Sequence, residues 1–252
     1  MTKTVALFGA TSEIAKQTAR SLIEESNEPV ELFLVGRDAE RLETLAADLK
    51  CRGAQRANFQ AVKDLTCPET QAKVLQDMQN AISCPDIALL CYGSLPDQER
   101  VKYDSELLAH EMAVNTTGQI GMLAGLASMF ILNNKGHIAA VTSVAGMRGR
   151  KSNFAYGAMK SAVSRYLQGM RLDLEPQGIA VLDIKPGLVR TPMTDGMDQS
   201  SVLWSDSDLV GRAIARKLLS GAGGVLYVPS YWRLIMYIVL ALPNTIMKRL
   251  DI

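Results

Sequence analysis

Tyr156 and Lys160 are four residues apart in a stretch of helical pattern, so their side chains share one face of the predicted helix. A phenol titrates near ~10 in water and is a poor base at neutral pH unless a nearby cation, here Lys160, favours the phenolate. Ser143 ends the preceding apolar run, at the edge where an open α/β sheet places its sites. These residue types predict acid–base chemistry. A plain helix face stays the alternative, because a Tyr-x-x-x-Lys pair is common by chance.

The first turn of the chain reads Gly9-Ala10-Thr11-Ser12-Glu13-Ile14-Ala15 and joins a short apolar run to a helical pattern. In such a turn the backbone N–H groups and the helix N-terminus bind the pyrophosphate of a dinucleotide. The Glu13 carboxylate is expected to repel a pyrophosphate unless it points away. The turn predicts a dinucleotide site, with a simple strand-to-helix connection as the alternative.

Arg37 follows the second apolar run, close to where an acidic residue would accept hydrogen bonds from the adenosine ribose of NAD. Gly36 occupies that acidic position. The guanidinium of Arg37 can pair with the ribose 2′-phosphate of NADP, a charge-assisted contact that NAD cannot offer. The pattern favours NADP over NAD, although a solvated Arg37 neutralised by Asp38 also fits it.

Short apolar runs alternate with helical patterns along the chain. The predicted strands are Thr4–Phe8, Val30–Val35, Ala57–Val62, Ile87–Cys91, Gly136–Ser143, Ile179–Ile184 and Val225–Val228. The predicted helices are Ile14–Leu22, Arg41–Leu49, Thr70–Ile82, Ser105–Leu132, Tyr156–Glu175 and Ser207–Ser220. This alternation predicts an α/β fold with a single Rossmann-like, doubly wound parallel sheet of about seven strands flanked by helices. We expect residues 1–229 to form the dinucleotide-binding catalytic domain and residues 230–252 an apolar tail of the same domain.

Composition argues against several classes of protein. With 27 basic and 26 acidic residues the formal net charge is +1, so no global field attracts nucleic acid or an anionic membrane. The four cysteines stand far apart without a C-x-x-C pair, which favours a reducing compartment, and we expect a cytoplasmic protein. The two histidines, His110 and His137, stand apart from any cluster with metal spacing, so no metal site is expected.

Taken together, these motifs resemble the short-chain dehydrogenase/reductase family from Thr4 to about Val228. Tyr156, Lys160 and Ser143 match the family's Tyr-x-x-x-Lys pair and its upstream serine. Further matches are Asn115 to the asparagine that supports the lysine, Asp64 to the aspartate beside the adenine, and Pro186-Gly187-Leu188-Val189-Arg190-Thr191-Pro192 to the segment along the nicotinamide. Two motifs depart from the family pattern: Glu13 and Ala15 replace glycines of TGxxxGxG, and Cys91-Tyr92-Gly93 keeps only the glycine of Asn-Ala-Gly.

The resemblance implies an NADPH-dependent reductase of a ketone or keto-sugar, in which hydride passes from the nicotinamide to the substrate carbonyl. It implies that Tyr156 protonates the developing alkoxide, that Ser143 aligns the carbonyl oxygen and that Lys160 also holds the nicotinamide ribose. The implied catalytic residues are Asn115, Ser143, Tyr156 and Lys160. The implied cofactor-binding residues are Gly9, Thr11, Ser12, Glu13, Ile14, Arg37, Asp64, Leu65, Gly93, Tyr156, Lys160, Pro186, Gly187, Val189 and Thr191. An alcohol dehydrogenase running in the oxidative direction and a catalytically silent cofactor-binding interaction protein stay open as alternatives.

The tail from Ser230 carries an apolar run that is too short to span a bilayer and is interrupted by Pro243. Its apolar side can rest in a membrane interface, with packing over the substrate cleft or on a neighbouring subunit as the alternative. That side consists of Trp232, Ile235, Val239, Leu242 and Ile246. Together with the first glycine turn, the tail resembles the family subset that includes reductases of 2-keto sugars carried on polyprenyl phosphate. This implies a small-molecule or lipid-linked substrate and peripheral membrane contact, while the family implies a homodimer or homotetramer.

Overall fold

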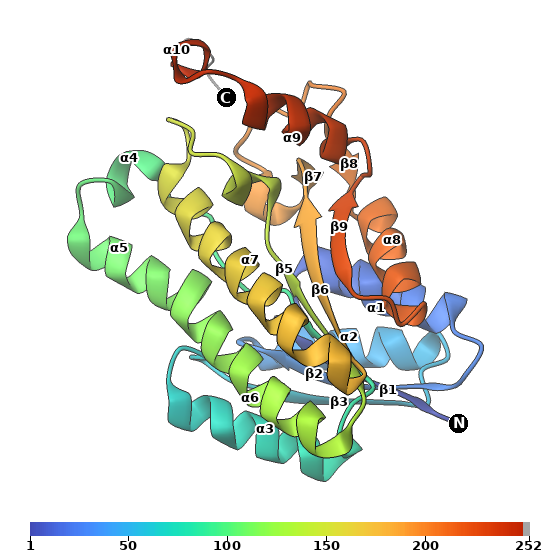
Figure 1. Cartoon of the computed structure of the whole chain (residues 1–252). Coiled ribbons are helices and arrows are strands. Elements are labelled where there is room, and N and C mark those ends of the chain that lie inside the picture. Colours follow the sequence, from blue (N-terminus) through green and yellow to red (C-terminus); the bar gives the residue numbers. More distant parts are fainter. Residues whose placement is uncertain (249–252) are drawn as a thin grey trace.

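A central sheet of seven parallel strands dominates the computed structural model, which describes residues 1–248. The strands are β1 (Lys3–Phe8), β2 (Val30–Gly36), β3 (Arg56–Ala61), β4 (Ile87–Leu90), β5 (Gly136–Val141), β6 (Ile179–Pro186) and β9 (Gly224–Val228). Their order is β3-β2-β1-β4-β5-β6-β9 (Figure 1). The direction of winding reverses at β1 and β4, so a ligand crevice is expected at their carboxyl ends. The predicted fold class is confirmed.

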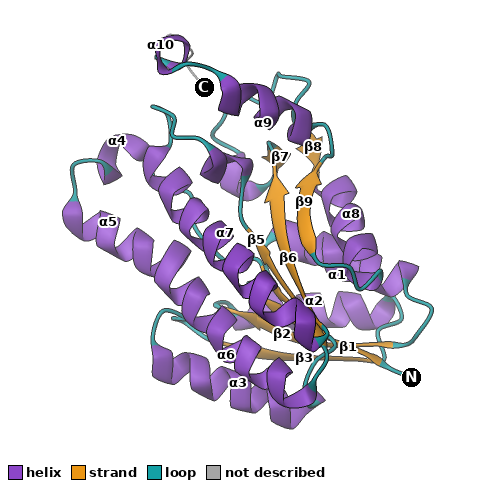
Figure 2. Ribbon diagram, viewed as in Figure 1, coloured by secondary structure: helices purple, strands orange, loops and turns teal. Residues whose placement is uncertain are grey.

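Helices cover both faces of this sheet (Figure 2). One face carries α1 (Glu13–Glu25), α2 (Ala39–Cys51) and α8 (Ser207–Leu219), and the other carries α3 (Pro68–Ile82), α6 (Gly118–Asn133) and α7 (Phe154–Leu174). Successive strand side chains point to opposite faces, which divides the apolar interior into two cores. In β1, Val5 and Leu7 belong to the core under α1, whereas Ala6 and Phe8 belong to the core under α7.

Local polar signals set several helix ends. The Asp38 carboxylate accepts a hydrogen bond from Arg41 N (3.1 Å) and caps α2. Pro68 stands in the first turn of α3, where a backbone N–H would have no partner within the helix. Asn134 ends α6 in the left-handed conformation, with φ 51°, which asparagine tolerates better than most residues. These ends lie within a few residues of the predicted ones.

The predicted long helix from residue 105 to 132 is interrupted. The chain forms α5 (Ser105–Met112), a π-helical turn (Ala113–Thr117) and then α6, and a short helix, α4 (Gln98–Val101), precedes them. A π-helical turn takes one extra residue per turn and is frequent at functional sites. Asn115 lies within it and is fully buried. Apolar spacing did not reveal the interruption, because the helical pattern resumes immediately after it.

The C-terminal segment lies across the carboxyl ends of β6 and β9, as α9 (Trp232–Ala241) followed by α10 (Asn244–Met247) (Figure 1). Trp232 and Met236 are buried against Val144, so one side of α9 packs on the domain. A small two-stranded sheet that the sequence did not predict, β7 (Val189–Arg190) and β8 (Ser205–Asp206), forms in the segment between β6 and α8. The last four residues of the predicted tail, 249–252, lie outside the described residues, and the boundary at residue 229 stays a prediction.

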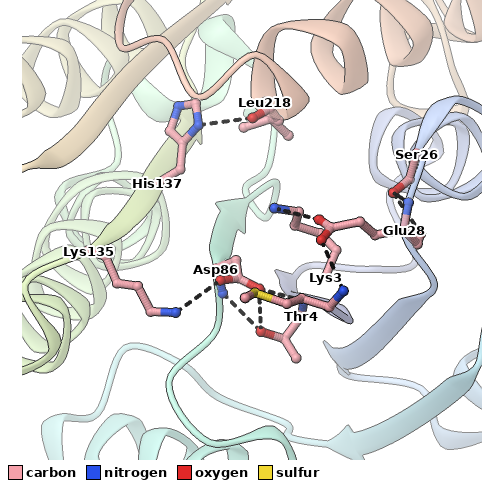
Figure 3. Close-up of polar contacts among 9 residues, drawn as sticks. Lys3, Thr4, Ser26, Glu28, Asp86, Lys135, His137 and Leu218 are labelled. Carbon is pink, nitrogen blue, oxygen red and sulfur yellow. Dashed lines mark hydrogen bonds and ion pairs between the residues drawn. The ribbon is translucent and has the colours of Figure 1, made fainter.

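Polar contacts join the amino-terminal ends of the strands to one another and to neighbouring elements, at the end of the sheet away from the C-terminal helices (Figure 3). Asp86 Oδ2 accepts hydrogen bonds from Thr4 N (2.9 Å) and Thr4 Oγ1 (3.1 Å), and Asp86 Oδ1 pairs with Lys135 Nζ at 3.6 Å. His137 Nδ1 lies 3.3 Å from Leu218 O, and burial lowers the pKa of this histidine to about 4. The imidazole is therefore neutral at neutral pH, and its contact joins β5 to α8.

Candidate active site

Ser143 stands two residues after β5, where a short 3-10 turn (Val144–Met147) begins. Its Oγ accepts a hydrogen bond from Ala145 N (3.0 Å), which fixes the hydroxyl at the start of the turn. The turn lies directly against α7, because a Cβ added at Gly157 would come within 2.8 Å of Ala145 O. The glycine therefore allows the close approach that brings Ser143 to the helix carrying Tyr156.

Tyr156 is half-buried in the first turn of α7. Burial raises the pKa of its phenol to about 12, and a hydrogen bond with the Ser143 hydroxyl acts in the opposite direction. The sequence argument expected Lys160 to favour the phenolate, but the structure differs because loss of solvent acts more strongly on the phenol. Lys160 Nζ lies 5.9 Å from the centroid of the Tyr156 ring. Tyr156 is consequently a neutral O–H donor at neutral pH.

Lys160 is 4% exposed, one helical turn after Tyr156. Loss of solvent lowers its pKa to about 8, while Cys91, when ionised, and the Asp183 carboxylate act to raise the pKa. Its Nζ donates to Val141 O at 3.2 Å, the one hydrogen bond it makes among residues 1–248. An ammonium group has three N–H donors, so two remain for a ligand such as a ribose diol.

Asn115 connects the π-helical turn to the chain after β4. Its Oδ1 accepts from Ser94 N (3.1 Å), and its Nδ2 donates to Ser94 Oγ (2.9 Å) and to Glu111 Oε2 (3.1 Å). Ser94 Oγ also hydrogen-bonds to Glu111. A Cβ at Gly93 would lie 2.7 Å from Asn115 Oδ1 and 3.3 Å from Lys160 Nζ, so Asn115 and Lys160 meet at this glycine. Ser94 and Glu111 were not among the residues predicted from the sequence, although Glu111 stands one helical turn before Asn115.

The first glycine turn fits a pyrophosphate in spite of its missing glycines. Gly9 adopts φ 80°, and a Cβ there would lie 2.6 Å from Tyr92 N, so this position requires glycine. Ser12 precedes α1 without a side-chain cap, which leaves the first N–H groups of the helix available. The Glu13 carboxylate points along its own helix, accepting from Gln17 Nε2 (2.8 Å) and pairing with Lys16 Nζ (3.5 Å). The expected repulsion of a phosphate is thereby reduced.

Two arginines flank the far end of this turn. Arg37 is exposed directly after β2, and Arg41 Nη2 donates to Thr11 O at 3.4 Å. Because Asp38 caps α2 through Arg41 N, its carboxylate is engaged by the backbone. The sequence argument missed Arg41, although it stands four residues after Arg37 at the start of a predicted helix. The pair gives this end of the crevice a positive charge suited to a phosphate.

Asp64 and Leu65 lie on the loop after β3, whereas Ile14 lies in the first turn of α1. Asp64 Oδ1 accepts from Thr66 N and Thr66 Oγ1, both at 2.7 Å, and these bonds lower the pKa of Asp64. The neighbouring Leu65 O accepts from Gln71 Nε2 at 2.6 Å. One carboxylate oxygen of Asp64 is therefore engaged by hydrogen bonds within its own loop. Ile14 packs partly buried against the core under α1.

The segment after β6 is held by the C-terminal strands and helix. Gly187 N donates to Val228 O (3.0 Å), Val189 pairs with Ser205 in the small sheet, and Thr191 caps a 3-10 turn (Pro192–Thr194). A Cβ at Gly187 would lie 1.8 Å from Trp232 Nε1, so the indole of α9 packs directly on this glycine. Packing of the tail over the substrate cleft was one alternative from the sequence, but Gly187 was not identified as its contact, because side-chain periodicity does not identify a partner.

The described residues offer neither a metal centre nor a membrane span. Within residues 1–248, no group of three or more His, Cys, Asp and Glu side chains is placed to hold a metal ion. In the same part of the chain, every helix is too short or too polar to cross a bilayer. The free polar groups at the carboxyl edge instead fit a nicotinamide dinucleotide: the uncapped start of α1, the spare donors of Lys160 and the two arginines.

Comparison with known proteins places these motifs in a family context. The chain matches the model of the family described as short chain dehydrogenase over residues 3–201. An uncharacterized oxidoreductase of Streptomyces coelicolor is 31% identical over 250 residues, covering 98% of this chain and 96% of that protein. One of Mycobacterium tuberculosis is 29% identical over 252 residues, with the same coverage of 98% and 96%. The structure of a short-chain dehydrogenase from Sphingobium yanoikuyae in complex with NADPH is similar, with a TM-score of 0.80, 25% identity and coverage of 96% of each chain.

Proposed function

We propose, since this chain belongs to the short-chain dehydrogenase/reductase family, that it reduces a substrate carbonyl with NADPH and that Tyr156 is the proton donor. Membership makes the chain an NAD(P)-dependent short-chain oxidoreductase. The preference for NADPH, the reductive direction and the residue roles are our inferences. The observation that carries them is the position of the Tyr156 phenol beside Lys160 and Ser143 at the carboxyl edge of the sheet, where burial raises its pKa.

Three side chains divide the work on the substrate oxygen. When bound, NADPH supplies the hydride that reduces the carbonyl carbon. The Ser143 hydroxyl, held at the start of its turn, aligns the carbonyl oxygen by a hydrogen bond. Tyr156 donates its phenolic proton to that oxygen as negative charge develops there, and the adjacent Lys160 ammonium favours the phenolate that remains. Lys160 also offers its two remaining N–H groups to the nicotinamide ribose.

A protonated Tyr156 is the form that reduction of a carbonyl requires. A phenol whose pKa is raised to about 12 stays protonated across the neutral range. It can give its proton to the developing alkoxide, because an alkoxide is more basic than a phenolate. Oxidation of an alcohol needs the phenolate instead, which this environment disfavours. We therefore expect the rate of alcohol oxidation to increase only at alkaline pH.

Turnover of NADPH tests the proposal. Purified protein is assayed by NADPH oxidation over ketones, sugars and lipid-linked sugars, beside the variant Tyr156→Phe. Loss of the proton donor is expected to lower kcat by about 100-fold or more while NADPH binding, followed by fluorescence titration, is retained. The matched control is Tyr103→Phe, which removes a phenol that is 85% exposed. Wild-type turnover in Tyr156→Phe would refute the assignment, and an absence of turnover on every substrate would favour a silent binding protein.

Arg37 and Arg41 support NADPH as the cofactor. A guanidinium that pairs with the 2′-phosphate contributes to the binding of NADPH and not of NADH. Arg37→Ala is expected to raise KM for NADPH by about tenfold or more and to leave KM for NADH unchanged. Equal effects on both cofactors would contradict the assignment.

A groove on the outer side of α7 supports a homo-oligomer. It has a volume of about 280 Å³ and is lined by apolar side chains of α4, α5 and α7, among them Leu108, Met112 and Phe154. Met112 and Phe154 are 44% and 46% exposed and line the same groove, and contiguous exposed apolar residues of this kind mark interaction sites. We infer that a second copy of the chain covers this face. Light scattering of Met112→Glu tests it, because a charge there is expected to reduce the assembly to monomers.

The outer side of α9 supports peripheral contact with a membrane and a lipid-linked substrate. The apolar side predicted from the sequence is used in packing on the domain, through Trp232 and the partly buried Ile235. Leu234, Tyr237 and Ile238 are 68%, 71% and 58% exposed on the outside of the helix. We infer that these residues rest on a bilayer. Co-flotation with anionic vesicles tests this: wild type is expected to float and the double variant Leu234→Ser/Ile238→Ser to remain in solution.

The cysteines support a reducing compartment, and we infer a cytoplasmic location. Cys51, Cys67, Cys84 and Cys91 are all free in the structure, and none faces another in a disulfide. Secreted proteins more often pair their cysteines. Cells that express the chain are fractionated, and Cys51 is tested for reactivity toward a membrane-impermeant thiol reagent before and after lysis. Labelling of Cys51 is expected only after lysis.

A further inference from the structure

Two oppositely charged side chains are buried on β6, outside the set of residues proposed for catalysis. Asp183 and Lys185 are 2% and 6% exposed, and Lys185 Nζ lies 2.8 Å from Asp183 Oδ2. They are two residues apart on one strand, so both point to the same face of the sheet. Ile179 and Val181 of the same strand belong to the core under α7, which identifies that face. A buried ion pair seldom stabilises a fold better than apolar residues would, so stability alone does not account for this pair.

The carboxylate of Asp183 joins two elements that carry proposed catalytic residues. Its Oδ1 accepts a hydrogen bond from Thr142 Oγ1 (2.5 Å), and Thr142 directly precedes Ser143. Its Oδ2 accepts from Ser164 Oγ (2.6 Å), and Ser164 stands one helical turn after Lys160 on α7. The end of β5 and the middle of α7 are therefore both tied to one buried group on β6.

Lys185 completes this cluster. Its Nζ donates to Ser164 Oγ at 2.5 Å in addition to its contact with Asp183. Charge-assisted hydrogen bonds of this kind are strong and directional when water is excluded. The four side chains Thr142, Ser164, Asp183 and Lys185 thus form one connected network within the sheet–helix interface.

The network also contributes to the electrostatic surroundings of Lys160, through Asp183. Asp183 is the carboxylate that acts to keep Lys160 protonated. Cys91, directly after β4, faces Lys160 as a neutral thiol, because burial raises its pKa to about 12. Tyr156 faces it from the same helix, also neutral at pH 7. On the side of α5, Glu111 reaches the site through its hydrogen bond to Asn115.

We propose that Asp183 and Lys185 are a buried positioning pair for the catalytic site, in which Asp183 sets Ser143 and Lys160 at a fixed separation through Thr142 and Ser164. The negative charge of Asp183 also favours the ammonium form of Lys160. Lys185 limits that charge effect and holds Ser164 in place. Neither residue touches the substrate or the cofactor in this scheme. The inference rests on the proposed roles of Ser143 and Lys160, but its test does not require turnover.

The charge effect is tested by titrating Lys160 directly. In protein labelled with ¹³C at the lysine ε-carbon, the Lys160 signal is assigned with Lys160→Met, and its midpoint is measured by NMR. Asp183→Asn removes the attracting charge and is expected to move the midpoint to lower pH by about one unit, whereas Lys185→Met leaves Asp183 uncompensated and moves it to higher pH. Midpoints that stay at the wild-type value, or that move in the same direction in both variants, would overturn the proposal.

Controls separate charge from folding. Asp48→Asn removes a carboxylate that pairs with Arg20 and Arg52 on the helix surface, and its Lys160 midpoint is expected to equal that of wild type. If either single β6 variant does not fold, the double variant D183N/K185M is titrated in its place, because it carries no buried charge on this strand. Its midpoint is expected below that of wild type, by less than in Asp183→Asn, because the lost attraction from Asp183 outweighs the lost repulsion from Lys185. A midpoint at or above that of wild type would overturn the charge effect.

The positioning effect is tested by changes that preserve charge. Ser164→Ala and Thr142→Val remove single hydrogen bonds to Asp183. Each is expected to lower kcat on the order of tenfold while KM for NADPH and the Lys160 midpoint remain those of wild type. Ser164→Thr, which keeps the hydroxyl, is expected to restore kcat. An unchanged kcat in both deletion variants would refute the positioning role, whatever the activity of Tyr156→Phe shows about the proton donor.

Discussion

Replacing Lys160 by Met is expected to make the protein more stable and inactive at the same time. Lys160 is 4% exposed, and loss of solvent lowers its pKa from the ordinary 10.5 to about 8. Each unit of pKa corresponds to ~1.4 kcal/mol, so the buried ammonium costs the folded state about 3 kcal/mol at pH 7. The variant loses the hydrogen bond to Val141 O, worth about 1 kcal/mol. A net gain of about 2 kcal/mol in the free energy of unfolding follows.

The pH dependence of that gain distinguishes charge burial from better packing. Between pH 8 and the ordinary lysine pKa of 10.5, the unfolded wild-type chain binds a proton that the folded chain has released. Wild-type stability therefore rises through this window relative to the variant, which carries no proton there. The advantage of Lys160→Met is expected to be fully present below pH 8 and to decline as the pH approaches 10.

Urea unfolding of both proteins from pH 6 to 10 measures the difference at each pH. Titrations of all other groups occur in both proteins and cancel in the difference, provided that the m-values agree. The control is Lys217→Met, at a partly exposed lysine in the last turn of α8, where no such pH-dependent gain is expected. A variant that is less stable than wild type at every pH, or more stable by a constant amount, would refute the reasoning.

Three further outcomes follow from the same geometry. Reductase kcat/KM is expected to fall as the pH rises through about 8, because Lys160 loses its proton there, and a steady-state profile that stays flat to pH 10 would contradict this. Gly93→Ala places a methyl group 2.7 Å from Asn115 Oδ1, so it is expected to lower the free energy of unfolding by about 1–3 kcal/mol and to lower kcat. The control Gly169→Ala meets no atom within 4 Å and is expected to raise the free energy of unfolding by up to ~1 kcal/mol in the same denaturant assay. Gly187→Ala pushes a methyl group to within 1.8 Å of the Trp232 indole and is expected to displace α9, which tryptophan fluorescence reports; an unchanged emission spectrum would argue against the packing described.

Much of the fold was determined by the sequence alone. Strands buried on both faces of a parallel sheet must be apolar throughout, so runs such as that ending at Gly9 are recognisable without a partner. Helical spacing between these runs then requires crossover helices on both faces of the sheet. The grouping of Ser143, Tyr156 and Lys160 was also predictable, because carboxyl ends of strands and one face of a helix are local properties.

Only the tertiary structure decided how the candidate site is tuned. The pKa of Tyr156 depends on how much solvent neighbouring elements exclude, and the direction of the Glu13 side chain depends on its partners. The π-helical turn at Asn115 leaves the apolar period on either side unchanged, so no pattern reveals it. No pattern in the sequence joins Asp183 and Lys185 to Thr142 and Ser164, and the network forms only because residues distant along the chain meet in a space without water. Periodicity reports which side of an element is buried, whereas the energy of a charge depends on every group around it.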